Sequence, residues 1–151
     1  MQAVEKCFIC AKHRGDVTIP GGAIYEDDHV YIGHVSAQNP ANVYLGYVMV
    51  EPKRHAPGLA DLTDSEAQTI GLWVSRVSRA LKATEHADHV YAFVLGDHVP
   101  HAHVHVVARY PGAPVEYWGV HVDEWLQAPR GGPSEIAAVC ERLRLYLQQN
   151  K

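Results

Sequence analysis

The stretch His101-Ala-His103-Val-His105-Val-Val107 decides which fold and which kind of site this chain builds. Side chains alternate between the two faces of a β-strand, so the three histidines share one face, and Ala102 and Val104 share the other. Successive residues on one face of a strand lie roughly 6–7 Å apart. We therefore predict a long strand, from His101 to Tyr110, with a histidine face and an apolar face that packs on the core.

Three imidazoles at this spacing can span a phosphate group and the atoms on either side of it. A neutral imidazole nitrogen can attack phosphorus at neutral pH and form a covalent phosphoramidate. A second, protonated imidazole can neutralise developing charge and protonate a leaving group. His103 is best placed to attack because it has a neighbour on each side. The alternative is a histidine-rich solvent face with adventitious metal binding, which the apolar character of the strand disfavours.

Patterns outside this strand predict the remaining elements. Short runs rich in β-forming residues predict four further strands, at 23–25, 29–33, 43–50 and 90–95. Thr63 and Glu66 form a capping box for a helix that runs to about Ala83. A last helix follows Gly131-Gly132-Pro133-Ser134. Direct links between strands favour an α+β fold, with an antiparallel sheet and helices packed on it.

Composition limits the class of protein. A chain of 151 residues favours one domain that buries a core without disulfides. The formal net charge of -4 gives no basic surface for nucleic acid. No apolar run approaches the roughly 18 residues that a membrane span requires. The first residues do not have the pattern of a secretory signal. We therefore expect a cytoplasmic protein with neither a nucleic acid nor a membrane as partner.

The three cysteines are Cys7, Cys10 and Cys140, an odd number that argues against a disulfide framework. The Cys7-Phe-Ile-Cys10 spacing is typical of half a zinc site. The other half has several candidates, which are His13, His29, His34, His55 and the histidine strand itself. A redox pair and two inert buried thiols are the alternatives. Cys140 falls in the last helix and is expected to be a small residue of the core or of its flank.

Taken together, these residues resemble the histidine-triad (HIT) superfamily. Four pieces occur in the family's order, namely Cys7-Phe-Ile-Cys10, Tyr25-Glu-Asp-Asp28, Val50-Glu-Pro-Lys-Arg-His55 and His101-Ala-His-Val-His-Val-Val107. The resemblance covers roughly Lys6 to Arg109. It implies an α+β domain with a five-stranded antiparallel sheet and two main helices, often paired as a homodimer. One HIT domain would then span 1–151, with a core at about 6–110 and a C-terminal tail and helix at 111–151.

The resemblance also implies a role for each of several residues. The zinc-containing branch of the family would use Cys7, Cys10, His55 and His101 as ligands. Four protein ligands make a closed zinc site, which is structural. His103 would be the nucleophile and His105 would contact the phosphate. Related nucleotidyl transferases carry glutamine at the third histidine, so His105 favours hydrolysis over transfer.

The chain departs from the family's pattern around the substrate. Gly46-Tyr47 stands where many members have Gly-His, and Val35, beside His34, stands where a ribose-binding aspartate is common. The turn 96–100 is shorter than the usual phosphate-binding Gly-Gln-Ser segment. We expect Tyr47, His34 and His98 to contact the substrate in their place, while recognition of adenosine stays open.

These features predict a nucleotide phosphoramidase or dinucleoside-polyphosphate hydrolase that acts through a covalent nucleotidyl-histidine. The absent aspartate and phosphate segment favour a second hypothesis, a nucleotide-binding module with little turnover. A third hypothesis is a pathway-specific enzyme, a hydrolase or transferase of a phosphate ester.

Overall fold

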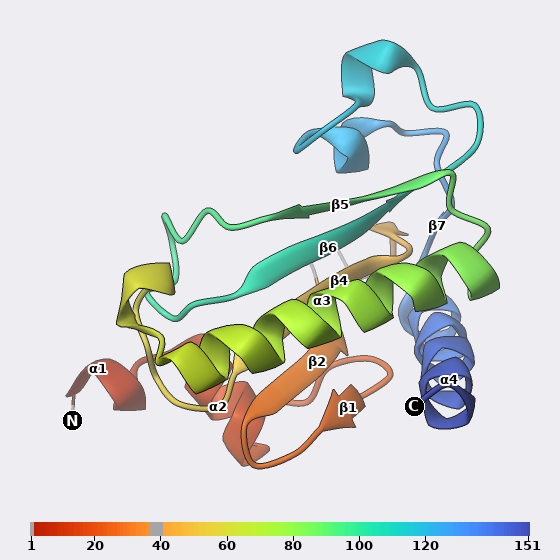
Figure 1. The fold of residues 1–151 in the computed structure, drawn as a ribbon. Coiled ribbons are helices and arrows are strands. Elements are labelled where there is room, and N and C mark those ends of the chain that lie inside the picture. The colour runs from red at the N-terminus through yellow and green to blue at the C-terminus, as the bar shows by residue number, and fades with distance from the viewer. Residues whose placement is uncertain (1, 37–40) are drawn as a thin grey trace.

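The computed structural model describes residues 2–36 and 41–151. Its centre is a five-stranded antiparallel sheet in the order β1-β2-β4-β6-β5 (Figure 1). These strands are β1 (Ala23–Glu26), β2 (Val30–His34), β4 (Tyr47–Pro52), β5 (His89–Phe93) and β6 (Val104–Arg109). A two-stranded sheet pairs β3 (Val43–Tyr44) with β7 (Arg130–Gly131). The predicted α+β fold with a five-stranded antiparallel sheet is confirmed.

Two long helices cover the sheet, as predicted. Helix α3 (Asp64–Thr84) packs on β4, β5 and β6, and helix α4 (Pro133–Gln149) packs on α3, β1 and β2. The capping box between Thr63 and Glu66 is present at the start of α3. The core holds the apolar stripe of α4, which is Ile136, Val139, Leu143 and Leu147. No helix in these described ranges is both long and apolar enough to cross a membrane.

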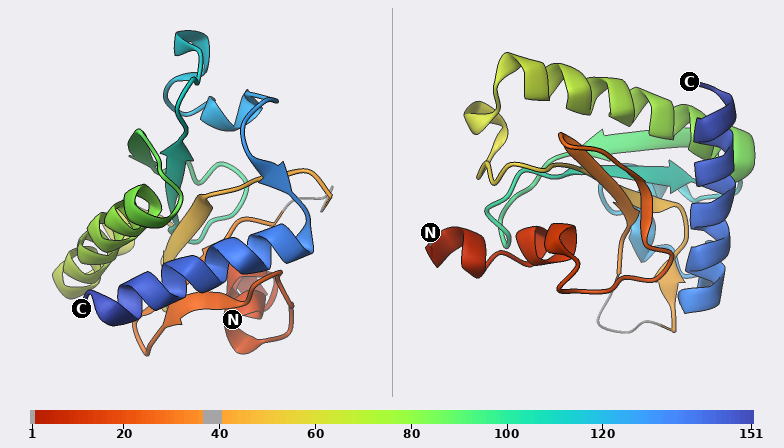
Figure 2. Two further views of the ribbon diagram at one scale, coloured as in Figure 1. Left: turned by 90° about the vertical axis from the view of Figure 1, so that its right-hand side faces the viewer. Right: turned by 90° about the horizontal axis from the view of Figure 1, so that it is seen from below.

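The N-terminal helices lie on the other side of the sheet. These are α1 (Gln2–Glu5) and α2 (Phe8–Arg14), and Figure 2 shows them on the side of the sheet that faces away from α3. Short 3-10 helices, η1 (Leu59–Asp61), η2 (Val115–Tyr117) and η3 (Val122–Glu124), occur in the connections. The segment that carries η2 and η3 projects beyond β5 (Figure 1). Helix α3 thus covers one face of the sheet, and the N-terminal helices lie on the opposite face.

Two predicted strands have wrong bounds. The histidine strand begins at Val104 and not at His101, because the Ala102 amide donates to the Ala56 carbonyl at 2.6 Å and not to a neighbouring strand. The predicted strand 43–50 is two strands, β3 and β4, separated by a turn at Gly46 with φ of 78°. Positive φ is readily adopted by glycine, which explains how the turn interrupts an otherwise continuous apolar run.

Candidate functional site

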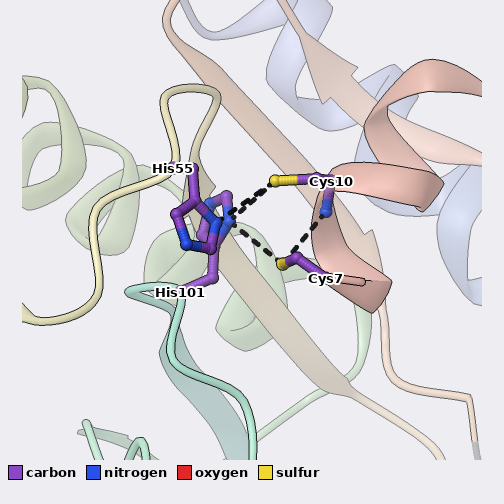
Figure 3. Close-up of side chains that lie close together, drawn as sticks. All are labelled: Cys7, Cys10, His55 and His101. Atoms are coloured by element: carbon purple, nitrogen blue, oxygen red, sulfur yellow. Dashed lines mark hydrogen bonds between the residues drawn. The ribbon is translucent and has the colours of Figure 1, made fainter. Parts of the chain in front are cut away.

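Two cysteines and two histidines converge where helix α2 meets the loops at one end of β4 and β6. Cys7 caps the start of α2, and its sulfur accepts a hydrogen bond from the Cys10 amide. His55 follows β4, and His101 precedes β6. The Nδ1 atom of His101 lies 3.6 Å from Cys7 Sγ and 3.4 Å from Cys10 Sγ, and His55 Nδ1 lies 3.4 Å from Cys10 Sγ. Figure 3 shows the four side chains pointing toward one another.

This arrangement fits a zinc ion. Zinc binds sulfur at about 2.3 Å and imidazole nitrogen at about 2.0 Å, so the edges of its tetrahedron measure roughly 3.3–3.8 Å. The printed sulfur-to-nitrogen distances fall in that range, and the four ligand atoms all lie within 4.8 Å of one another. His101 Nε2 lies 2.8 Å from the Pro52 carbonyl. That carbonyl accepts the Nε2 proton, which leaves the Nδ1 lone pair free for a metal.

Burial shifts the pKa values of residues in this cluster. Burial, followed by the hydrogen bond to Cys7, raises the pKa of the Cys10 thiol to about 11. A bound zinc ion would reverse that effect by stabilising the thiolate. Burial lowers the pKa of His101, so the ring is neutral, as a metal ligand must be. The residues therefore make a Cys2His2 set that can hold zinc, and the four ligands are those that the family resemblance implied.

A buried carboxylate ties α2 to the sheet beside this cluster. Glu51, on β4, is 1% exposed, and it accepts from Lys12 Nζ at 2.6 Å and from His13 Nε2 at 2.8 Å. Burial acts to raise the pKa of Glu51, but the hydrogen bond from His13 and the charge of Lys12 outweigh it, so the pKa is lowered. His13, one of the histidines considered as a zinc ligand, thus bonds to a carboxylate next to the cluster.

His103 has one ring nitrogen committed and the other free to react. Its Nδ1 lies 2.6 Å from the His101 carbonyl oxygen, which can only accept, so Nδ1 carries the proton. Whenever the ring carries only this one proton, Nε2 presents its lone pair. The ring is 8% exposed, and its centroid lies 5.0 Å from that of His105. The prediction that these two side chains share a face is confirmed, whereas the His101 ring lies with the cysteines.

His105 is held between side chains from the strands on either side of it. Phe93, directly opposite on β5, stacks on the ring with centroids 4.8 Å apart and planes 11° apart. The Tyr47 hydroxyl, from β4, lies 2.7 Å from His105 Nδ1. Burial, followed by the charge of His103, lowers the pKa of His105 to about 4. At neutral pH the ring is therefore uncharged, in contrast to the protonated second imidazole considered from the sequence.

The other two predicted substrate contacts lie in different surroundings. His34 is 2% exposed; its Nδ1 donates to the Val35 carbonyl, and its Nε2 accepts from the amides of Gly46 and Tyr47. Burial lowers the pKa of His34, in keeping with a neutral ring. His98 is exposed in the turn before the triad. His34 therefore braces the turn that leads into β4, while His98 lies at the surface near the triad in sequence.

A small cavity of about 170 Å³ lies beside His103. Side chains from α2, β2, β4 and the turn before the triad line it, and these are Phe8, Ile9, Lys12, Ile19, His34, Val35, Ser36, Met49, Glu51, Val99 and His103. The lining includes Val35, where the sequence analysis expected the family's ribose-binding aspartate to be replaced. Of the three histidines of the triad, His103 lines this cavity, whose wall is mostly apolar.

Three residues of the site were missed by the sequence analysis. Taken alone, each residue is ordinary for its position. Phe93 belongs to an apolar strand, Glu51 lies near the end of another strand, and Lys12 lies in a helix. Strand register places Phe93 against His105, and a buried ion pair joins the other two across 39 residues. An acidic residue at the end of an apolar strand, with a lysine near the cysteine pair, was the available signal for that pair.

Comparisons with known proteins agree with this geometry. Residues 17–112, more than half of the chain, match the model of the HIT domain. The chain is 28% identical over 137 residues to the protein named hit of Bacillus subtilis, covering 83% of this chain and 87% of that protein. This protein therefore belongs to the HIT family.

Solved structures share the fold. A Zn-bound histidine triad family protein from Mycobacterium smegmatis superposes with a TM-score of 0.71 at 24% identity, covering 97% of this chain and 96% of that one. A hypothetical histidine triad nucleotide-binding protein from Sulfolobus tokodaii gives a TM-score of 0.71 at 19% identity, with coverage of 95% and 93%. At these identities the likeness concerns the fold.

Proposed function

We propose that the protein hydrolyses phosphoramidate or phosphoanhydride bonds of nucleotides through a covalent nucleotidyl-histidine on His103. The observation that carries the proposal is the hydrogen bond from His103 Nδ1 to the His101 carbonyl. It holds the ring in the tautomer whose Nε2 lone pair can attack phosphorus at neutral pH. Membership of a family that includes nucleotide-binding proteins by name supports a nucleotide as substrate.

The reaction has two displacements at the α-phosphorus. His103 Nε2 forms a bond to phosphorus, and the bond to the leaving amine or phosphate breaks with its electron pair, which takes up a proton. Water then attacks phosphorus, loses a proton, and the phosphorus–nitrogen bond breaks so that the lone pair returns to Nε2. The sum is addition of one water across the original bond. The neutral His105 ring contacts the phosphate throughout.

Zinc has a structural role in this proposal. With four protein ligands the ion has no open position for water or substrate. It would join α2 to the segment just before β6, and the His101 main chain in that segment orients His103. The ion would supply the positive charge that keeps both cysteine side chains in the thiolate form.

The proposal is tested with a nucleotide phosphoramidate and a dinucleoside polyphosphate as substrates. We expect the wild-type protein to hydrolyse at least one of them and a His103→Ala variant to bind the substrate without turnover. His29→Ala is the matched control, because His29 is exposed in a turn far along the chain from the triad. Mass spectrometry after rapid acid-free quenching should find a nucleotidyl group on His103.

A contrary result has a defined meaning. Tight binding of both compounds by the wild-type protein without hydrolysis would favour the nucleotide-binding module. The apolar Val35 in the wall of the cavity beside His103 supports that second candidate, because it cannot bond a ribose hydroxyl. Hydrolysis of only non-nucleoside phosphate esters would favour the pathway-specific enzyme.

We further propose that the protein is a cytoplasmic homodimer. All three cysteines are free thiols, which suits a reducing compartment.

Large apolar side chains are exposed on the segment that carries η2 and η3, among them Val115, Trp118 and Leu126. Large apolar side chains left exposed on one segment are candidates for a protein interface. Light scattering should give twice the chain mass, and a single-chain mass at micromolar concentration would contradict the dimer.

A further inference from the structure

The hydroxyl of Tyr47 and the ring of His105 form a hydrogen bond whose direction decides the tautomer of His105. The Tyr47 hydroxyl lies 2.7 Å from His105 Nδ1, which is a short, well-formed bond. If the ring donated to the tyrosine oxygen, the phenol proton would need an acceptor of its own, and no second partner of this hydroxyl occurs among residues 2–36 and 41–151. A phenol that donates to Nδ1 places the ring proton of the neutral His105 on Nε2.

That Nε2 atom is the unusual polar atom of the site. It is buried, and it has no hydrogen-bond partner in the described part of the chain. A buried N–H group without a partner costs free energy, so its presence in a folded protein calls for an explanation, such as a role in ligand binding. The neighbouring His103 ring lies 5.0 Å away between centroids. A phosphate oxygen bonded to His103 would find this N–H within reach.

The geometry of the sheet explains why Tyr47 and not another residue reaches His105. Met49 is paired with His105 across the strands β4 and β6, so Tyr47, two residues earlier, lies on the same face at the diagonal position. Phe93 covers the opposite side of the ring by stacking. His105 is therefore fixed in rotation by Phe93 and in tautomer by Tyr47.

We propose that Tyr47 is a positioning residue whose hydroxyl holds His105 in the Nε2–H tautomer, so that this N–H donates to the phosphate oxygen during the reaction. The inference rests on the proposed function, and it assigns Tyr47 a task different from direct contact with the substrate. Burial raises the pKa of Tyr47, so the phenol keeps the proton that it donates. The burial that lowers the pKa of His105 to about 4 keeps the ring neutral in the resting protein.

Nitrogen-15 NMR of histidine-labelled protein tests the assignment without any need for turnover. Long-range correlations to the ring protons distinguish a protonated from an unprotonated ring nitrogen, and a His105→Gln sample identifies the His105 signals. At pH 7 we expect the wild-type protein to show His105 protonated at Nε2. Tyr47→Phe, which removes one oxygen atom, should shift the His105 signals toward a mixture of tautomers. Tyr25→Phe removes the hydrogen bond from Tyr25, on β1, to Asp27, and it should leave the His105 signals unchanged.

Steady-state kinetics supply the second readout. We expect Tyr47→Phe to lower kcat about tenfold or more while KM changes less than about threefold, because one lost hydrogen bond in the transition state has that size. A rise in KM alone, with unchanged His105 signals, would make Tyr47 a substrate contact and overturn the proposal. So would wild-type His105 protonated at Nδ1, a measurement that needs no variant to fold. Absence of turnover in the wild-type protein would contradict only the proposed function, since the NMR result stands alone.

Discussion

The ring of His103 donates a hydrogen bond from Nδ1 to the main-chain carbonyl of His101, 2.6 Å away. One residue thus has two tasks, because the His101 side chain belongs to the Cys2His2 cluster while its carbonyl oxygen orients the proposed nucleophile. Any movement of the main chain at His101 is transmitted to the direction of the His103 lone pair. Metal content and activity should therefore change together in this protein.

Elemental analysis tests the metal cluster directly. We expect about one zinc per chain in the wild-type protein and none in Cys10→Ala. An ion present at 100 times its Kd stabilises the fold by about 2.7 kcal/mol. Loss of that ion should lower the Tm of a domain of this size by roughly 5–11 °C. Cys140→Ala is the matched control, because Cys140 is also a buried cysteine but belongs to the core packing of α4. Full zinc in Cys10→Ala would exclude the proposed ligand set.

Replacement of His105 by glutamine should slow hydrolysis by about 10²- to 10⁴-fold, the usual size of a positioned proton donor's contribution. The covalent nucleotidyl group on His103 should then accumulate, because its breakdown by water loses the N–H contact. Intact-mass spectrometry during turnover measures that species. His29→Ala should behave as the wild-type protein does. Unchanged turnover in His105→Gln would remove His105 from the mechanism.

The buried carboxylate predicts a pH-dependent stability. The pKa of Glu51 in the folded protein lies below its ordinary value of 4.5, so its stabilising contribution is complete above that pH. The contribution is lost as the pH falls through the lowered folded pKa. Thermal melts between pH 6 and pH 3 should therefore show a steeper loss of stability for the wild-type protein than for Glu51→Gln.

At pH 7 the Glu51→Gln variant should be less stable by about 3–5 kcal/mol, because it leaves Lys12 buried beside a neutral group. Asp16→Asn is the control for an exposed ion pair with Arg14 and should change stability by less than about 1 kcal/mol. Equal effects of the two substitutions would mean that burial adds nothing to the Glu51 pair.

Two glycine substitutions should have opposite effects. At Gly46 φ is 78°, and a Cβ atom would lie 2.6 Å from the Tyr110 hydroxyl oxygen, so Gly46→Ala should cost about 1–3 kcal/mol. It should also lower activity, because this turn precedes Tyr47. Gly71→Ala, in the middle of α3 with no atom near the added carbon, should stabilise the protein by about 0.5–1 kcal/mol. Chemical denaturation measures both, and a stable, active Gly46→Ala would contradict the strain argument.

Local patterns predicted the parts of the fold that depend on local interactions. The Thr63–Glu66 capping box fixes the start of α3 through bonds between near neighbours, and alternation predicts that His103 and His105 share a face. The start of β6 could not be predicted, because it depends on a hydrogen bond from Ala102 to Ala56, which lies far away in the sequence. The break before β4 was hidden because its neighbours on both sides are apolar.

The site divides in the same way. The resemblance to the HIT family named the four residues that the structure brings together at the metal cluster. The surroundings of His105 depend on strand register, which pairs β6 with β4 and β5 from different parts of the chain. The roles of His34, His98 and Tyr47 as substrate contacts stay predictions, and the hydrogen bonds of Tyr47 and His34 suggest that these two act through neighbouring groups.

The distribution of the four proposed zinc ligands along the chain has a consequence for biosynthesis. Cys10 and His101 are 91 residues apart, so a ribosome adding about 5–20 residues per second needs about 5–18 seconds to make the second after the first. Throughout that interval the nascent cysteine pair has no complete tetrahedral site. Any ion that it captures must fill its coordination with water or with borrowed ligands, and oxidants can reach the thiols. The proposed metal site can therefore be completed only after His101 has been made.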